Sequence, residues 1–147
     1  MSNEHGLSLY LIAPLIAWFL AQFTKFLLNK RSQAGQRWRL LYQSGNMPSA
    51  HTATLVALTT VIGMQDGTMS GLFAVALSLT AITAYDALMV RRSGGEQGLA
   101  LRKLLEISPF VKDPLPYQAL GHRPLEVAAG ALLGIVIGLC VAFFITI

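Results

Sequence analysis

The chain has 147 residues, of which 54% are hydrophobic and 12% are charged. Soluble domains carry about 25% charged residues, so this composition argues against a soluble globular protein and for one embedded in lipid. The formal net charge is +4. In so apolar a chain we attribute this basic balance to loops that lie against anionic lipid headgroups, and we expect no nucleic-acid partner.

Four apolar stretches approach the length that crosses a hydrocarbon core, which is about 20 residues. In chain order they are residues 7–28, 48–64, 71–90 and 124–147. The second is the shortest, so it spans with a tilt, enters the membrane partway or is buried by its neighbours. The N-terminal MSNEH has neither a basic start nor a small-residue cleavage site, so we expect the first stretch to remain in the mature protein.

The connection after the third stretch contains two further patterns. Its first residues, RRSGGEQG, predict a flexible turn. The overlapping segment EQGLALRKLLEI mixes leucines with charged residues, which predicts a short helix lying in the membrane interface. A loop helix packed on its neighbours is the alternative. The sequence therefore predicts a single all-α domain over residues 1–147, a polytopic bundle of about four transmembrane helices with a short interfacial helix.

The basic residues indicate which side of the membrane each connection occupies. All 11 Lys and Arg residues lie around the first and third connections, whereas the second connection, QDGTMS, has none. Loops rich in Lys and Arg usually stay in the cytoplasm. With four spans the first and third connections share one side, so we expect a multi-pass protein of the cell membrane with that side in the cytoplasm.

Each apolar stretch carries an ionisable residue close to its basic end, namely Lys25, His51, Asp86 and Glu126. Such residues are costly inside a membrane and usually face a cavity or a partner. Each also has a structural explanation: Lys25 can extend to the interface, Asp86 can pair with Arg91, and Glu126 can interact with a helix N-terminus. Their convergence at one level favours a functional site on the predicted cytoplasmic face.

Two helix starts and several arginines suggest what this site binds. Pro48 and Pro124 each suit the first position of a helix, and helix N-termini bind phosphate well. Forked guanidinium donors that suit phosphate oxygens are available from Arg37, Arg39, Arg91, Arg92 and Arg123. A phosphate pocket beside the bilayer follows from this combination.

Two histidines lie in the same layer. His122 precedes Glu126 by four residues, so on a helix the carboxylate can accept a hydrogen bond from the imidazole and raise the basicity of its other nitrogen. Such a histidine can attack phosphorus while His51 protonates the leaving oxygen. The alternative is that both histidines only cap helices. Scattered Asp and Glu around two histidines match no metal-ligand spacing, so we expect no metal or other cofactor.

Several motifs resemble a known family. NMPSAH resembles the second signature, PSGH, of the type 2 phosphatidic acid phosphatase family, and GHRPLE resembles the end of its third signature. GNMPSAHTA, YDALMVRRSGGEQ and LGHRPLEVAAG together resemble the small divergent branch of that family, which is related to acid phosphatases and vanadium haloperoxidases. The resemblance extends from about residue 22 to about residue 138.

The resemblance implies roles for individual residues. His122 would be the catalytic nucleophile that forms a phosphohistidine, Glu126 the acid that orients it, and His51 the acid for the leaving group. Position 126 is Glu where the wider family has Asp, and no Ser-Arg pair precedes His122. The expected phosphate-binding residues are Ser49, Lys25, Arg37, Arg39, Asp86, Arg91 and Arg92, of which the last three belong to the divergent branch's own motif.

The function that we expect from these features is hydrolysis of a membrane lipid phosphate or diphosphate, without a metal, through a covalent histidine. Phosphatidate, phosphatidylglycerol phosphate and polyprenyl diphosphate remain equally open as substrates. The alternative is a noncatalytic membrane protein that binds anionic lipid or transports a small anion. Gly130, Gly134 and Gly138 form a smooth helix face that suits packing within the chain or a homodimer.

Overall fold

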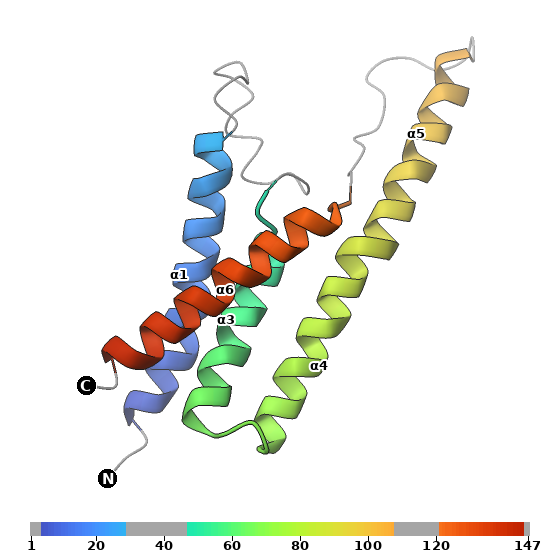
Figure 1. Ribbon diagram of the computed structural model, residues 1–147. Coiled ribbons are helices and arrows are strands. Elements are labelled where there is room, and N and C mark those ends of the chain that lie inside the picture. The colour runs from blue at the N-terminus through green and yellow to red at the C-terminus, as the bar shows by residue number, and fades with distance from the viewer. Residues whose placement is uncertain (1–3, 29–46, 108–120, 146–147) are drawn as a thin grey trace.

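The computed structural model describes residues 4–28, 47–107 and 121–145 (Figure 1). Every regular element in these ranges is helical. Arg37 and Arg39, two predicted phosphate ligands, lie outside the described residues. The elements are α1 (Glu4–Leu28), α3 (Ala50–Gln65), α4 (Gly71–Tyr85), the π-helix η1 (Asp86–Val90), α5 (Arg91–Ile107) and α6 (Pro124–Ile145).

Three described helices are long and apolar enough to cross a membrane: Leu9–Leu28, Gly71–Ile107 and Pro124–Phe144. The predicted second span forms α3, which has 16 residues and packs in the centre of the bundle against α1, α4 and α6. At about 1.5 Å per residue it is roughly 24 Å long, shorter than a hydrocarbon core of about 30 Å. The prediction of an all-α membrane protein is confirmed, with α3 covered by its neighbours.

Small side chains hold α1 against α3. Ala13, Ala17 and Ala21 recur every fourth residue of α1 and are completely buried, as are Ala53 and Ala57 of α3. Alanines at this spacing form a smooth face that lets two helix backbones approach closely. Alanine methyl groups and backbone atoms therefore form much of the contact between α1 and α3.

The glycine stripe of α6 packs on the opposite side of α3. A Cβ atom added at Gly130 would lie 2.4 Å from the Ser49 carbonyl oxygen, and one at Gly134 would lie 2.5 Å from that of Ala53. These positions therefore exclude any side chain. The stripe packs within the chain, and a homodimer stays a prediction.

The segment after the third predicted span differs from our expectation. The prediction of a flexible turn at residues 91–98 is wrong, because α4, η1 and α5 form one uninterrupted helix from Gly71 to Ile107. The predicted helical segment is present, but it continues the direction of α4 (Figure 1). Glycine inside a helix costs only about 1 kcal/mol, so helical neighbours can carry Gly94 and Gly95 in the same conformation.

The helix ends divide the molecule into two poles. The end of α1 and the beginnings of α3 and α6 lie toward one pole, and the beginning of α1 and the end of α6 lie toward the other (Figure 1). Lys25 in the last turn of α1, His51 in the first turn of α3 and Glu126 in the first turn of α6 are therefore brought to one pole.

Candidate functional site

The first turn of α6 is organised by Glu126. The helix begins at Pro124, as predicted, and the Arg123 backbone N–H donates to Glu126 Oε2 over 3.3 Å. A carboxylate in the third helical position that accepts from the residue before the helix is half of a capping box. This contact holds the Glu126 side chain close to the residues that precede α6.

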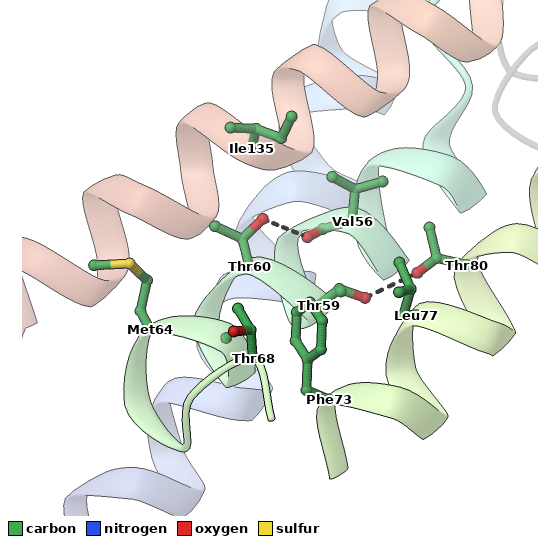
Figure 2. Close-up of a pocket in the computed structure, with 10 residues that line it drawn as sticks. Val56, Thr59, Thr60, Met64, Thr68, Phe73, Leu77, Thr80 and Ile135 are labelled. Atoms are coloured by element: carbon green, nitrogen blue, oxygen red, sulfur yellow. Dashed lines mark hydrogen bonds between the residues drawn. The ribbon is translucent and has the colours of Figure 1, made fainter. Parts of the chain in front are cut away.

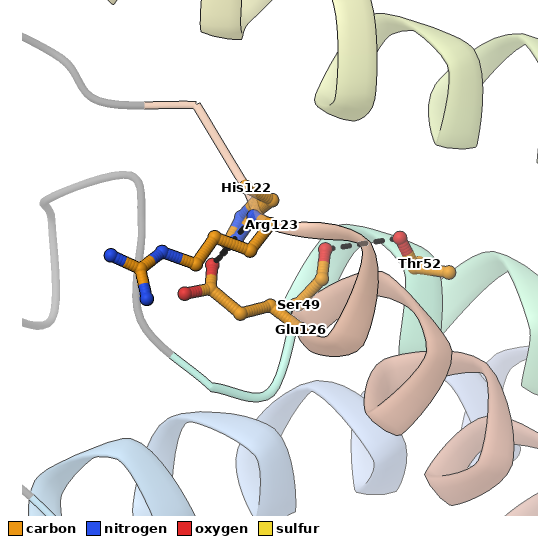
Figure 3. Close-up of polar contacts among 5 residues, drawn as sticks. All are labelled: Ser49, Thr52, His122, Arg123 and Glu126. Carbon is orange, nitrogen blue, oxygen red and sulfur yellow. Dashed lines mark hydrogen bonds and ion pairs between the residues drawn. The ribbon is translucent and has the colours of Figure 1, made fainter.

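The same carboxylate oxygen binds the imidazole of His122. His122 Nδ1 lies 2.8 Å from Glu126 Oε2 (Figure 3), so the hydrogen bond predicted from the four-residue spacing is present. The His122 side chain is 4% exposed and that of Glu126 is 14% exposed. With Nδ1 donating to the carboxylate, the lone pair of Nε2 is left for another partner, and the carboxylate stabilises positive charge on the ring.

The residues before α6 pack against the π-helix η1 and the start of α5. The His122 N–H donates to the Ala87 carbonyl over 3.2 Å. A Cβ atom at Gly121 would lie 2.3 Å from the backbone nitrogen of Arg92, so only glycine permits this close approach. Single π turns often occur at functional sites. Here the π turn directly precedes Arg91 in the chain, and its Ala87 carbonyl binds the segment that contains His122.

Ser49 connects α3 to α6. Its backbone N–H donates to the Glu126 carbonyl over 2.9 Å, and its hydroxyl lies 3.0 Å from that of Thr52 (Figure 3). The residue is completely buried. The hydroxyl is thus engaged with Thr52, and its predicted contact with phosphate stays a prediction. The prediction for Pro48 was wrong by two positions, since α3 begins at Ala50 with Ser49 as its N-cap.

The ionisable residues predicted to converge do so around His51, in the first turn of α3. His51 interacts electrostatically with Arg91, Lys25, His122 and Asp86. Residues from α1, α3, the long α4–η1–α5 helix and the start of α6 therefore surround one region. His51 itself is exposed, whereas its neighbour His122 is buried.

Charges on three elements complete the region. Lys25 is only 5% exposed and interacts electrostatically with Glu126. Asp86 and Arg91 form the predicted ion pair, with 2.5 Å between Asp86 Oδ2 and Arg91 Nε. Arg92 instead pairs with Glu96 over 3.2 Å. Among the predicted arginines that the structure describes, Arg91 is the one whose charge acts on His51.

Three groups that help to build the site were not predicted from the sequence: Gly121, Thr52 and the Ala87 carbonyl. Gly121 directly precedes His122 in LGHRPLE, and a glycine beside a candidate nucleophile was the one available signal of a close backbone approach. The Ala87 carbonyl had no such signal, because its partner His122 is distant in the chain. Thr52 lies only three residues after its partner Ser49, so this spacing on a helix was an available signal that the sequence reading did not use. Among the described residues, no group of three or more His, Cys, Asp or Glu could hold a metal ion.

Comparisons with known proteins identify the family. The model of the divergent PAP2 family matches residues 8–137. This chain belongs to the divergent PAP2 family. A relative from Bacillus subtilis (strain 168), named uncharacterized membrane protein YuiD, is 34% identical over 91% of this chain and 94% of its own length. No solved structure matches the chain significantly. The resemblance found in the motifs is therefore confirmed for the family as a whole.

Proposed function

We propose that this divergent PAP2 protein is a metal-independent hydrolase of a lipid phosphate or diphosphate and that His122 is its nucleophile. The observation that carries the proposal is the 2.8 Å contact between His122 Nδ1 and Glu126 Oε2. It engages Nδ1, fixes the orientation of the ring and leaves the lone pair of Nε2 for attack on phosphorus. The electrostatic interaction of His122 with His51 provides a second titratable group in the same region.

The reaction has two steps. His122 Nε2 attacks phosphorus, the N–P bond forms, and the bond between phosphorus and the lipid oxygen breaks while His51 gives that oxygen a proton. Water then attacks the phosphohistidine, His51 removes a proton from it, and the N–P bond breaks to release phosphate and restore His122. Glu126 stabilises the positive charge on the imidazole during both steps.

The phosphoryl oxygens need positive partners during this transfer. The first-turn N–H groups of α3 have no acceptors within their own helix, and the helix dipole makes that end favourable for anions. Arg91 and Lys25 add full charges whose fields reach His51. Asp86 holds the Arg91 side chain through its ion pair. We assign phosphate binding to these groups, with Ser49, Arg37, Arg39 and Arg92 as further predicted contributors.

The substrate is a lipid whose tail remains in the bilayer. The basic connections favour a site on the cytoplasmic face of the cell membrane, where lipid phosphates made on that leaflet can enter laterally. Phosphatidate, phosphatidylglycerol phosphate and polyprenyl diphosphates all combine a phosphoryl head with a long hydrocarbon tail. We propose this class as the substrate.

The test is phosphate release from that panel of lipids by the purified protein with a chelator present. The wild type should release phosphate, and H122N should release none. Asparagine keeps a donor near the Nδ1 position for Glu126 but has no nucleophilic nitrogen, so H122N should stay folded. A phosphoryl label that is stable to base and labile to acid should appear on the wild type and be missing from H122N. Turnover by H122N would contradict the nucleophilic role.

A second candidate function is noncatalytic binding of anionic lipid. It is favoured by the burial of His122, whose side chain is only 4% exposed, because a nucleophile needs contact with its substrate. Under this candidate the His122–Glu126 contact only fixes the start of α6. The wild type would then bind the lipid panel without releasing phosphate, and H122N would bind equally well.

A further inference from the structure

A pocket lies on the side of α3 that faces α4 and α6, toward the pole opposite His122. Its volume is about 350 Å³. All three helices contribute to its wall, with Thr59 and Thr60 from α3, Phe73, Leu77 and Thr80 from α4, and Ile135 from α6 (Figure 2). The volume falls at the lower end of the range for ligand pockets, about 300–1,000 Å³, which suits a single slender ligand.

The wall is apolar although it contains threonines. The Thr59 and Thr60 hydroxyls donate to the carbonyls of Leu55 and Val56, each over 2.8 Å. The Thr80 hydroxyl donates to the Ala76 carbonyl over 2.9 Å and lies equally close to that of Thr59. These hydroxyls are therefore satisfied by protein atoms. A ligand in the pocket needs no hydrogen-bonding group to complete them.

The pocket opens on the outside of the bundle. Leu77 is 49% exposed and Ile135 is 43% exposed, so the rim faces the surroundings. The helices α4 and α6 approach each other near η1 and separate toward the opposite pole (Figure 1). These residues belong to the candidate membrane spans Gly71–Ile107 and Pro124–Phe144, so in a bilayer the opening would face hydrocarbon.

We propose that this pocket holds the hydrocarbon tail of the lipid phosphate whose head occupies the His51 region. The inference rests on the proposed function. One helix connects the two places, because His51 lies in the first turn of α3 and Thr59 lies eight residues further along it. Eight residues span about 12 Å of helix, which is within one leaflet of a hydrocarbon core about 30 Å thick. A single acyl or prenyl chain covers that distance.

The experiment compares two tryptophan variants of α6 with the wild type. I135W fills the pocket from its rim, and L132W places the same side chain on an exposed position of the same helix that does not line it. Binding of nonhydrolysable methylphosphonate and dodecylphosphonate is measured on the full chain in detergent. The gain in affinity from methyl to dodecyl is compared between variants, so that partitioning into detergent cancels.

We expect the ratio of dodecylphosphonate affinity to methylphosphonate affinity to be about tenfold smaller in I135W than in the wild type. A loss of this size corresponds to fewer than two buried methylene groups at about 0.8 kcal/mol each. L132W should keep the full gain, and all three proteins should bind methylphosphonate equally. An equal gain in I135W and the wild type would overturn the pocket assignment, as would loss in both variants to the same extent.

Turnover separates this inference from the proposed function. Phosphate release by the wild type with no chain-length dependence would overturn the tail pocket alone. Chain-length-dependent binding that I135W weakens, without phosphate release from any lipid, would overturn catalysis and leave the tail pocket supported. Absence of both phosphonate binding and phosphate release would overturn both proposals.

Discussion

Two long apolar helices of this protein are held in different ways. In α6, 33% of the residues in its 18-residue apolar segment are buried. The glycines of α6 lie directly on the backbone of α3. In the helix that runs from Gly71 to Ile107, only 11% of the residues in the corresponding 18-residue segment are buried. That helix meets the start of α6 chiefly where Gly121 and His122 contact η1 and Arg92. The candidate site therefore lies where a tightly packed core joins a sparsely packed helix.

This difference indicates how a membrane protein can combine a fixed site with access for a lipid. Close backbone packing leaves no alternative positions for α6, because interiors at this density do not deform continuously. The histidine and its carboxylate partner are attached to this rigid helix. The helix that carries Arg91 and one wall of the pocket has fewer contacts to break, and segments with sparse contacts open at lower free energy.

The largest expected effect comes from disturbing the tight contact. G134V should lower the free energy of unfolding by about 3 kcal/mol, because a Cβ there already lies 2.5 Å from the Ala53 carbonyl oxygen and overpacking has costs of this order. Unfolding in mixed micelles measures the change. The matched control is G94A on α5, where an added Cβ meets nothing within 4 Å. It should stabilise the protein by up to about 1 kcal/mol. Equal effects of the two variants would remove the contrast between the helices.

A smaller effect is expected where the two parts join. G121A should lower kcat/KM for a lipid phosphate by about 100-fold, since its methyl group would push His122 away from Ala87 and displacements near 1 Å have effects of that size. Phosphate release measures the change, and phosphohistidine labelling should fall in parallel. G71A, which adds a methyl group in open space, should keep the wild-type rate. Unchanged turnover in G121A would show that this contact does not position the nucleophile.

The smallest effect is expected on the exposed end of the long helix. Arg102 and Glu106 pair over 3.2 Å with side chains about half exposed, at 47% and 54%. Such pairs on helix surfaces contribute about 0.3–0.5 kcal/mol. E106Q should therefore change the free energy of unfolding by less than about 0.5 kcal/mol and leave phosphate release unchanged. A loss of several kcal/mol would mean that α5 is held far more firmly than its exposure indicates.

The sequence alone predicted the features that depend on neighbours along the chain. Apolar run length indicated the membrane class and the helices. The four-residue spacing of His122 and Glu126 predicted their hydrogen bond, and the spacing of Asp86 and Arg91 predicted their ion pair. The first contact is readable because residues four apart meet on one face of an α-helix. Asp86 and Arg91 are five apart, and the π turn η1, in which the Arg91 N–H donates to the Asp86 carbonyl, brings them together.

Only the tertiary structure decided the features that join distant segments. It continued the helix through Gly94 and Gly95, buried Ser49 between α3 and α6, and formed the pocket from three helices. The Ala87 carbonyl accepts its hydrogen bond from His122, which is 35 positions later in the sequence. A local pattern contains no information about which distant backbone group will arrive there, so the packing of the helices decides whether such a segment turns or continues.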